Sequence, residues 1–102
     1  MIILLGDLKV DKKDVAAFKA AAEKMIRATR EEAGCLSYTF GEDTIEPGLF
    51  RIAEKWASPG ELDAHMKSAH MGELQQALSK MQVLGLRVVA IDGANERVVM
   101  GG

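Results

Sequence analysis

The sequence predicts an α+β domain with the split βαβ, or ferredoxin-like, topology, in which helices cover one face of an antiparallel sheet. Two observations lead to this class. Strand-like apolar runs and helix-like periodic segments follow one another in the order β-α-β-β-α(α)-β. The chain is 102 residues long and has no internal repeat, which fits a single domain. We expect this domain over residues 1–93, followed by a tail or short extra strand over residues 94–102.

The first strand is predicted over residues 2–10, which are rich in Ile, Leu and Val. Asp11 then caps a helix, and Asp14 lies in its first turn, where a carboxylate suits the helix dipole. Gly34 is expected to end this helix, because glycine tolerates the left-handed conformation common at that position. The apolar face of the helix recurs at helical spacing through Val15, Phe18, Ala22, Met25, Ile26 and Thr29.

A hairpin follows, with strands over residues 35–40 and 49–57 and a polar connection over residues 41–48. Strand alternation places Phe50, Ile52, Glu54 and Trp56 on one face of the second strand and Arg51, Ala53 and Lys55 on the other. On the first strand, Leu36, Tyr38 and Phe40 form one set.

Two helix starts follow the hairpin. Ser58 and Glu61 form a capping box with Pro59 at the first helical position. Ser68 is expected to cap a second helix, and Gly85 to close it. The apolar stripes comprise Leu62, Met66 and Ala69 in the first helix and Met71, Leu74, Leu78 and Met81 in the second. Residues 86–91 predict the last strand, and Asp92-Gly93 a turn.

The composition excludes several classes of function. The net charge is −2, and the 13 Lys and Arg residues are dispersed, so no nucleic-acid partner is expected. No run approaches the roughly 20 apolar residues that span a bilayer, so no membrane partner is expected either. Cys35 is the only cysteine and cannot form an internal disulfide, which favours a cytoplasmic protein. Without a neighbouring base in the sequence, Cys35 is more readily a buried structural thiol than a nucleophile.

Two strands are apolar on both sides, where a half-solvated antiparallel strand would alternate. They are Ile2–Leu5 and Val88–Ile91. One side can pack on the helices, but the other would leave a patch of several hundred square ångströms, which monomers rarely expose. We therefore expect a homodimer in which sheet packs against sheet. The alternative is that the tail over residues 94–102 covers this surface.

Residues able to form a small-molecule pocket gather between residues 34 and 70. Tyr38, Glu54, the only Trp (Trp56) and both His residues (His65 and His70) lie there. Helical spacing places His65 on the apolar stripe, and His70 can flank it. A layer of such groups between sheet and helices fits a mostly apolar cavity with a few polar groups.

Each of these residues also has a purely structural interpretation. A histidine on an apolar stripe is commonly a hydrogen-bonded core residue, Trp56 can be a core filler, and Glu54 can be a surface charge if it is solvated. Glu54, His65 and His70 are metal-ligand types. The two His residues are five apart, however, or about 140° around an ideal helix, so no metal is expected.

Three segments, AGCLSYTF, LFRIAEKW and SPGELDAHMKSAHM, resemble the antibiotic biosynthesis monooxygenase domain, including its quinol monooxygenase-like members. The resemblance covers roughly residues 1–92. It implies ferredoxin-like subunits that form a dimeric α+β barrel, with a cavity between sheet and helices. It also implies a cofactor-independent monooxygenase that oxidises a quinol or polyphenolic aromatic with O₂.

Carried onto this chain, the resemblance suggests catalytic and substrate-binding residues. A neutral imidazole suits the base that deprotonates a phenol, so His70 or His65 is the expected base, with Glu54 orienting an imidazole or a substrate hydroxyl. Trp56 and Tyr38 would pack against the substrate ring. Phe40 and Met66 complete the expected substrate-binding residues.

Besides an isomerase- or decarboxylase-like role on the same scaffold, two other functions stay open. One is a non-catalytic dimeric barrel that binds a small apolar ligand or serves in a stress response, which imidazoles outside the cavity would favour. The other is haem binding or degradation. Haem-degrading relatives use an Asn on the first strand, and this chain has Gly6 and Asp7 there.

Overall fold

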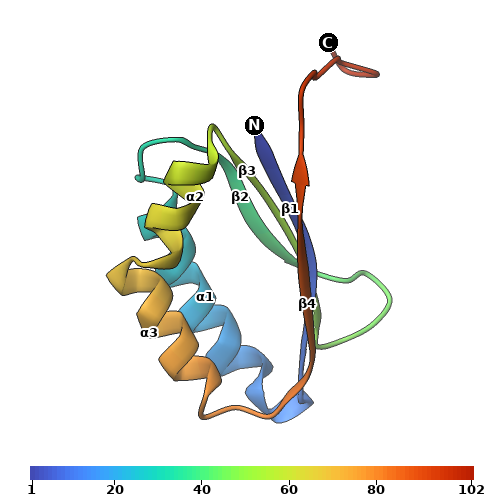
Figure 1. Cartoon of the computed structure of the whole chain (residues 1–102). Helices are drawn as coiled ribbons and strands as arrows, with labels where there is room; N and C mark the ends of the chain where they lie inside the picture. The colour runs from blue at the N-terminus through green and yellow to red at the C-terminus, as the bar shows by residue number, and fades with distance from the viewer.

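The computed structural model describes residues 1–102 as one four-stranded antiparallel sheet with helices on one face (Figure 1). The strand order is β2-β3-β1-β4, and this arrangement confirms the predicted fold class. The elements are β1 (Ile2–Val10), the 3₁₀ turn η1 (Lys12–Asp14), α1 (Val15–Thr29), β2 (Cys35–Glu42), β3 (Leu49–Trp56), α2 (Pro59–Met66), α3 (Ala69–Leu78) and β4 (Val83–Asp92).

The inner face of the sheet carries the core. Even-numbered residues of β1 and β3 point toward the helices, as strand alternation requires. α1 contributes Phe18, Ala22 and Met25 to the same core, and α3 contributes Leu74. The sheet supplies Ile2, Leu4, Leu8, Val10, Tyr38, Phe50, Ile52 and Trp56.

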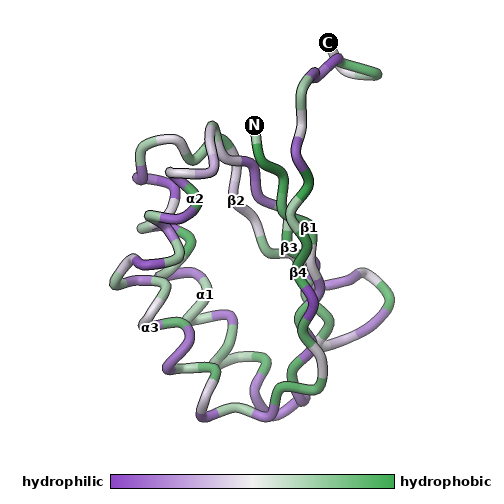
Figure 2. The backbone as a smooth tube through the Cα atoms, viewed as in Figure 1, coloured by the Kyte–Doolittle hydropathy of each residue, from purple (hydrophilic) through white to green (hydrophobic).

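β4 is the least covered strand. Of its ten residues only Val89 is even partly buried, although Val, Leu and Ile dominate the sequence. Leu86 and Val88 pair with Leu8 and Gly6 of β1 and therefore belong to the inner face, yet they are 62% and 42% exposed. Figure 2 shows that hydrophobic residues predominate along β1 and β4. The helices thus leave an apolar margin of the sheet uncovered on its inner side.

The first helix begins and ends differently from the sequence prediction. Asp11 does cap the turn, since its carboxylate accepts a hydrogen bond from the Lys13 N–H at 3.0 Å, but this first turn is the separate 3₁₀ segment η1. α1 ends at Thr29, not at Gly34. Gly34 has φ of +79° at the entrance to β2, so its left-handed conformation serves the turn and not the helix end.

A register shift at the start of β2 corrects the predicted inner set of that strand. The shift lies between Cys35 and Ser37, and it places Cys35 against the core while Leu36 is exposed. Tyr38 and Phe40 face inward as expected. An irregularity of one residue changes the face of every side chain before it, which alternation alone does not reveal.

The second helical segment is broken in two. Pro59 opens α2 as predicted, but the Ser58 hydroxyl makes no capping hydrogen bond. α2 ends at Met66, and Ser68 caps α3 by accepting from the Met71 N–H at 3.2 Å. The Ser68 hydroxyl also donates to the His65 carbonyl at 2.6 Å, which ties the two helices across the break.

The C-terminal region corrects one further expectation. β4 begins at Val83, so Gly85 lies inside the strand and does not close a helix. Residues 93–102 form no strand. Glu96 contacts Lys55, but Val98, Val99 and Met100 are exposed and the chain end projects away from the sheet (Figure 1). The tail therefore contacts the outer face of the sheet at Lys55 but leaves Leu5 and Ile91 of that face exposed.

The two serine caps offer a matched test of this break. Replacing Ser68 by Ala should lower the free energy of unfolding by about 1 kcal/mol, because α3 loses a cap hydrogen bond. Ser58→Ala should cost clearly less, since that hydroxyl makes no such bond. Urea denaturation of both variants measures the difference, and equal losses would contradict the assigned caps.

Candidate functional site

A hollow of about 250 Å³ lies between the inner face of the sheet and the side of α3 that faces it. It borders the uncovered margin at β4, where Leu86 and Val88 form part of its wall. Eleven of its thirteen lining residues are hydrophobic, so it suits an apolar ligand. The lining comprises Leu4, Leu8, Tyr38, Phe40, Ile52, Glu54, Met66, Met71, Leu74, Gln75, Leu78, Leu86 and Val88.

The hollow receives four of the seven residues proposed from the sequence: Tyr38, Phe40, Glu54 and Met66. The other three, Trp56, His65 and His70, do not line it. Trp56 and His65 are almost completely buried behind the wall, and His70 lines a separate hollow beside α1.

Glu54 is the only carboxylate on the hollow. The residue is 8% exposed, and one of its oxygens accepts a hydrogen bond from the Trp56 indole N–H at 3.0 Å. Its other oxygen makes no hydrogen bond within the chain. Burial raises the pKa of this carboxyl, and the hydrogen bond from Trp56 only partly opposes that effect. A carboxylate of this kind is a stronger proton acceptor than a solvated one.

Trp56 acts as a core residue that supports the site. Its ring centre lies 4.8 Å from that of His65 and 6.2 Å from that of Tyr38. Tyr38 and His65 are themselves 5.2 Å apart in an edge-on arrangement. Three packed rings leave little freedom for any one of them, so the direction of the indole N–H toward Glu54 is fixed.

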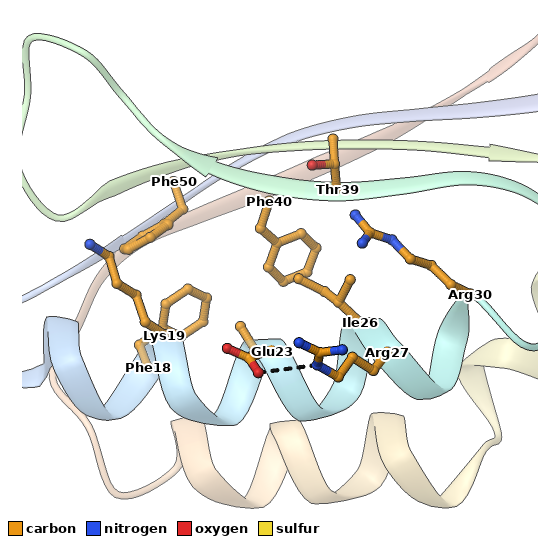
Figure 3. A pocket seen from close by; sticks show the side chains of 10 residues that line it. Phe18, Lys19, Glu23, Ile26, Arg27, Arg30, Thr39, Phe40 and Phe50 are labelled. Carbon is orange, nitrogen blue, oxygen red and sulfur yellow. Dashed lines mark hydrogen bonds and ion pairs between the residues drawn. The ribbon is translucent and has the colours of Figure 1, made fainter.

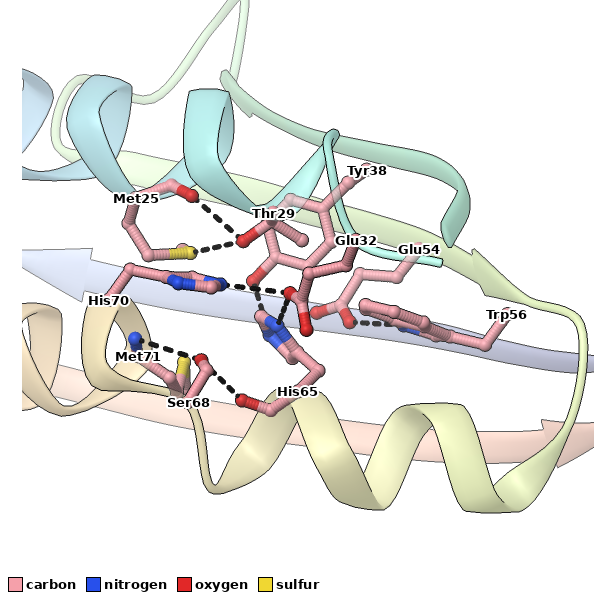
Figure 4. A network of polar contacts seen from close by, with 10 residues as sticks. All are labelled: Met25, Thr29, Glu32, Tyr38, Glu54, Trp56, His65, Ser68, His70 and Met71. Carbon is pink, nitrogen blue, oxygen red and sulfur yellow. Dashed lines mark hydrogen bonds and ion pairs between the residues drawn. The ribbon is translucent and has the colours of Figure 1, made fainter. Parts of the chain in front are cut away.

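A chain of polar contacts continues from the wall of the hollow toward the surface (Figure 4). The Tyr38 hydroxyl lies 3.3 Å from His65 Nε2. His65 Nδ1 lies 2.7 Å from Glu32 Oε2, and His70 Nε2 lies 2.9 Å from the same oxygen. A carboxylate accepts only, so each imidazole donates to Glu32. When neutral, His65 then accepts the Tyr38 proton at Nε2.

The break between α2 and α3 explains how both imidazoles reach one carboxylate. On a continuous helix they would point about 140° apart. The interruption at Lys67 and Ser68 redirects α3, and the donor atoms of Glu32, His65 and His70 all lie within 4.8 Å of one another. The expectation that the two imidazoles point apart is therefore wrong.

Sequence reasoning missed Glu32. It lies in the turn after α1 and follows Glu31, a pair that resembles an ordinary charged helix end. Its neighbour Arg30 fixes that turn on β2, because the guanidinium donates two hydrogen bonds to the Tyr38 carbonyl, at 2.8 and 3.0 Å. The one available signal was indirect: a buried histidine needs a polar partner.

Cys35 fits the structural role expected for it. Burial raises the pKa of its thiol, and the nearby Glu32 and Glu54 carboxylates raise it further. The thiol is therefore less readily ionised than a free cysteine, the opposite of what a nucleophile needs.

A second hollow of about 330 Å³ lies over α1 and β2 (Figure 3). Its cationic side chains already have partners: Lys19 pairs with Glu42, Arg27 with Glu23, and Arg30 with the Tyr38 carbonyl. Of the residues proposed from the sequence it contains only Phe40. It offers neither an unpaired charge nor a buried carboxylate.

Comparison with known proteins identifies the family of this chain. Residues 1–77 match the antibiotic biosynthesis monooxygenase family over most of the domain, and the chain belongs to that family. This confirms the resemblance drawn from the three sequence segments. No helix of the chain has the length and apolar character needed to cross a membrane.

Individual relatives support the same assignment. A structure from Deinococcus radiodurans, described as a "putative antibiotic biosynthesis monooxygenase", superposes with a TM-score of 0.92 at 30% identity and covers 99% of this chain and 100% of its own. Rv0793 from Mycobacterium tuberculosis has a TM-score of 0.85 at 23% identity, covering 95% and 98%, and so shares the fold. The uncharacterized protein sll1783 of Synechocystis is 33% identical over 71% of this chain, and the match spans only 49% of that relative.

The raised pKa of Glu54 makes a prediction about stability. A carboxyl whose pKa is higher in the folded chain takes up a proton on folding, so the free energy of unfolding falls as pH rises through the folded-state pKa. Glu54→Gln should therefore be more stable than the wild type near pH 8, and this advantage should vanish below the unfolded-state pKa of about 4.3.

Thermal unfolding across this pH range measures the effect, and Glu31→Gln is the matched control because Glu31 is exposed. A Glu54→Gln variant that is less stable than the wild type near neutral pH would show that burial of the charged carboxylate does not destabilise the folded chain.

Proposed function

We propose that the chain is a cofactor-independent monooxygenase that oxidises a small quinol or polyphenolic aromatic with O₂ in the hollow beneath α3. The observation that carries this proposal is a single buried carboxylate, that of Glu54, on an otherwise apolar wall. Such a wall suits an aromatic ring, and the carboxylate can accept a proton from its hydroxyl. Membership of the antibiotic biosynthesis monooxygenase family supports the reaction class.

Glu54 takes the role of base in this proposal, in place of His70 or His65. Neither imidazole lines the hollow, whereas the unpaired oxygen of Glu54 belongs to a residue on its wall. Glu54 removes a proton from the quinol hydroxyl, and the quinolate then transfers an electron to O₂. Recombination at a ring carbon forms a C–O bond.

The proton held by Glu54 passes to the resulting peroxide. Cleavage of the O–O bond, with loss of the hydrogen from the same ring carbon, then releases the second oxygen atom as water and leaves a carbonyl. The sum, quinol + O₂ → hydroxyquinone + H₂O, balances without a further reductant, because the quinol supplies all four electrons.

The size of the hollow limits the substrate. A volume of about 250 Å³ is just below the ~300–1,000 Å³ usual for ligand pockets. A ring system of one or two rings fits such a space, and a large polycyclic molecule does not. Phe40 and Met66 provide apolar contact surface, and Tyr38 adds an aromatic edge.

We also propose that two copies pack through the outer faces of their sheets. Ile3, Leu5, Ala53, Val89 and Ile91 lie on that face, according to strand register and alternation. Leu5 and Ile91 are 47% and 44% exposed in the single chain. Burial of this patch by a second copy would remove an apolar surface from water.

Leu5→Asp tests this dimer. Leu5 contributes little to the core of the single chain, so the variant should fold. Its dimer dissociation constant should rise at least about tenfold, because a charge would be buried in an apolar interface. Light scattering coupled to size exclusion measures the mass. Val99→Asp, in the exposed tail, should stay dimeric. A monomeric wild type would refute the sheet-to-sheet interface.

Two other functions remain as outcomes of the same assays. The position of both imidazoles outside the hollow favours a module that binds a small apolar ligand without turnover. Haem has less support: Gly6 offers no side chain where haem-degrading relatives have Asn, and Asp7 points to the outer face and pairs with Arg51 at 2.6 Å.

The activity test is oxygen uptake with a panel of hydroquinones, with product followed by absorbance. Glu54→Gln keeps an acceptor for the Trp56 N–H but cannot take up the proton, so uptake should fall by about 100-fold or more. Glu31→Gln and His70→Ala should retain most activity. Loss in His70→Ala with full activity in Glu54→Gln would assign the base to an imidazole.

Binding of the same hydroquinones without uptake would identify the binding module instead. A Soret band on titration with haem would support the haem alternative.

A further inference from the structure

We propose that Glu32, His65 and His70 form a binding site for one divalent transition-metal ion, of the kind for which Zn²⁺ is the natural probe. The site lies at the break between α2 and α3, next to the turn that follows α1 (Figure 4). It is separate from the hollow that carries Glu54, and its existence does not depend on the reaction proposed there.

The donor atoms have the right identity and spacing. Two imidazoles and one carboxylate are a common three-ligand set for zinc, which leaves a fourth position for water. Bonds of 2.0–2.2 Å to a tetrahedral ion place neighbouring ligand atoms about 3.3 Å apart. Glu32 Oε2 lies 2.7 Å from His65 Nδ1 and 2.9 Å from His70 Nε2, and all three atoms fall within 4.8 Å. Both distances to Glu32 Oε2 are shorter than this spacing, so Glu32 and His70 must each move outward by a small amount to open room for the ion.

The ligands differ usefully in mobility. The His65 side chain is 1% exposed and is packed between the rings of Trp56 and Tyr38, so it is a fixed ligand. Glu32 and His70 are 18% and 21% exposed, so they can adjust their positions. With one fixed ligand and two that can shift, the cluster can open to bind an ion.

His65 also has the outer partner that a metal-bound imidazole requires. With Nδ1 on the ion, the ring proton moves to Nε2, which lies 3.3 Å from the Tyr38 hydroxyl oxygen and can donate to it. The hydrogen bond between these two residues then runs in the opposite direction, and the Tyr38 proton becomes available to another acceptor. Tyr38 lines the Glu54 hollow, so metal binding would change the hydrogen bonding of a residue on the wall of that hollow.

The surroundings allow an ion to enter. A hollow of about 260 Å³ lies beside His70, between α1 and α3, and provides access and space for a water ligand. Lys24 borders this hollow, but its ammonium pairs with Glu73 at 3.3 Å. The Glu32 carboxylate supplies a negative charge that complements a divalent cation, which favours binding of the ion over two neutral imidazoles alone.

The test uses tag-free full-length protein stripped of metal with a chelator. Titration with Zn²⁺ by calorimetry should give one ion per chain, and Co²⁺ in its place should give the visible absorption of a tetrahedral site. Zinc should also raise the melting temperature, because it binds only the folded chain.

Two variants test the ligands, and a third is the control. His70→Ala removes a partly exposed ligand and should weaken binding more than about 100-fold, since loss of an outer partner alone costs about 10–100-fold. Glu32→Gln should weaken it similarly. Glu73→Gln is the matched control: its carboxylate borders the same hollow but lies outside the cluster, so affinity should stay within about threefold. Far-ultraviolet circular dichroism checks that each variant folds.

Two results would overturn the proposal: a wild-type chain that binds no zinc or cobalt at stoichiometric concentration, or equal affinity in the wild type, His70→Ala and Glu32→Gln. Oxygen uptake is not a readout here, so failure of the metal site and failure of the proposed monooxygenase activity are distinguishable.

Discussion

The arrangement of the site depends on the hydrogen bonds that the Glu32 carboxylate accepts from two imidazoles. One of its oxygens joins the turn after α1 to both halves of the broken helical segment, through His65 and His70. His65 in turn faces the hydroxyl of Tyr38, and Arg30 fixes the backbone of Tyr38 from the end of α1. Removal of the Glu32 carboxylate would leave a buried imidazole without its charged partner, and the wall of the hollow would lose its support.

The hollow itself follows from how the helices cover the sheet. α1 and α3 pack on each other and on the inner face, but the inner side of β4 remains open at Leu86 and Val88. A cavity at this margin is apolar because strand alternation places aliphatic side chains there. Glu54 interrupts that apolar surface, and the energetic cost of burying its charge is visible in its raised pKa. Functional groups commonly carry such perturbed pKa values.

Much of the fold could be predicted from the sequence, for identifiable reasons. Alternation assigned Glu54 and Trp56 to the inner face, and the Pro59 and Ser68 signals located the starts of α2 and α3. Alternation failed at Leu36, where a register shift intervenes, and Gly34 was misassigned because a left-handed glycine serves turns as well as helix ends.

The site was harder to predict than the fold. Glu54, Tyr38, Phe40 and Met66 line the hollow, because local periodicity determines the side of an element on which a residue lies. The relation between His65, His70 and Glu32 could not be derived, because it depends on the angle between two helices and on a turn more than thirty residues away. Helical periodicity describes one straight element, and here the contact crosses a break.

The most direct test of this account is a crystal structure of the chain with a non-oxidisable phenol analogue of the quinol. The aromatic ring is expected in the hollow beneath α3, with its hydroxyl oxygen within hydrogen-bond distance of the Glu54 carboxylate. A ring bound instead in the second hollow, over α1 and β2, would contradict this expectation. A hydroxyl held by an imidazole, with Glu54 turned away, would also contradict it.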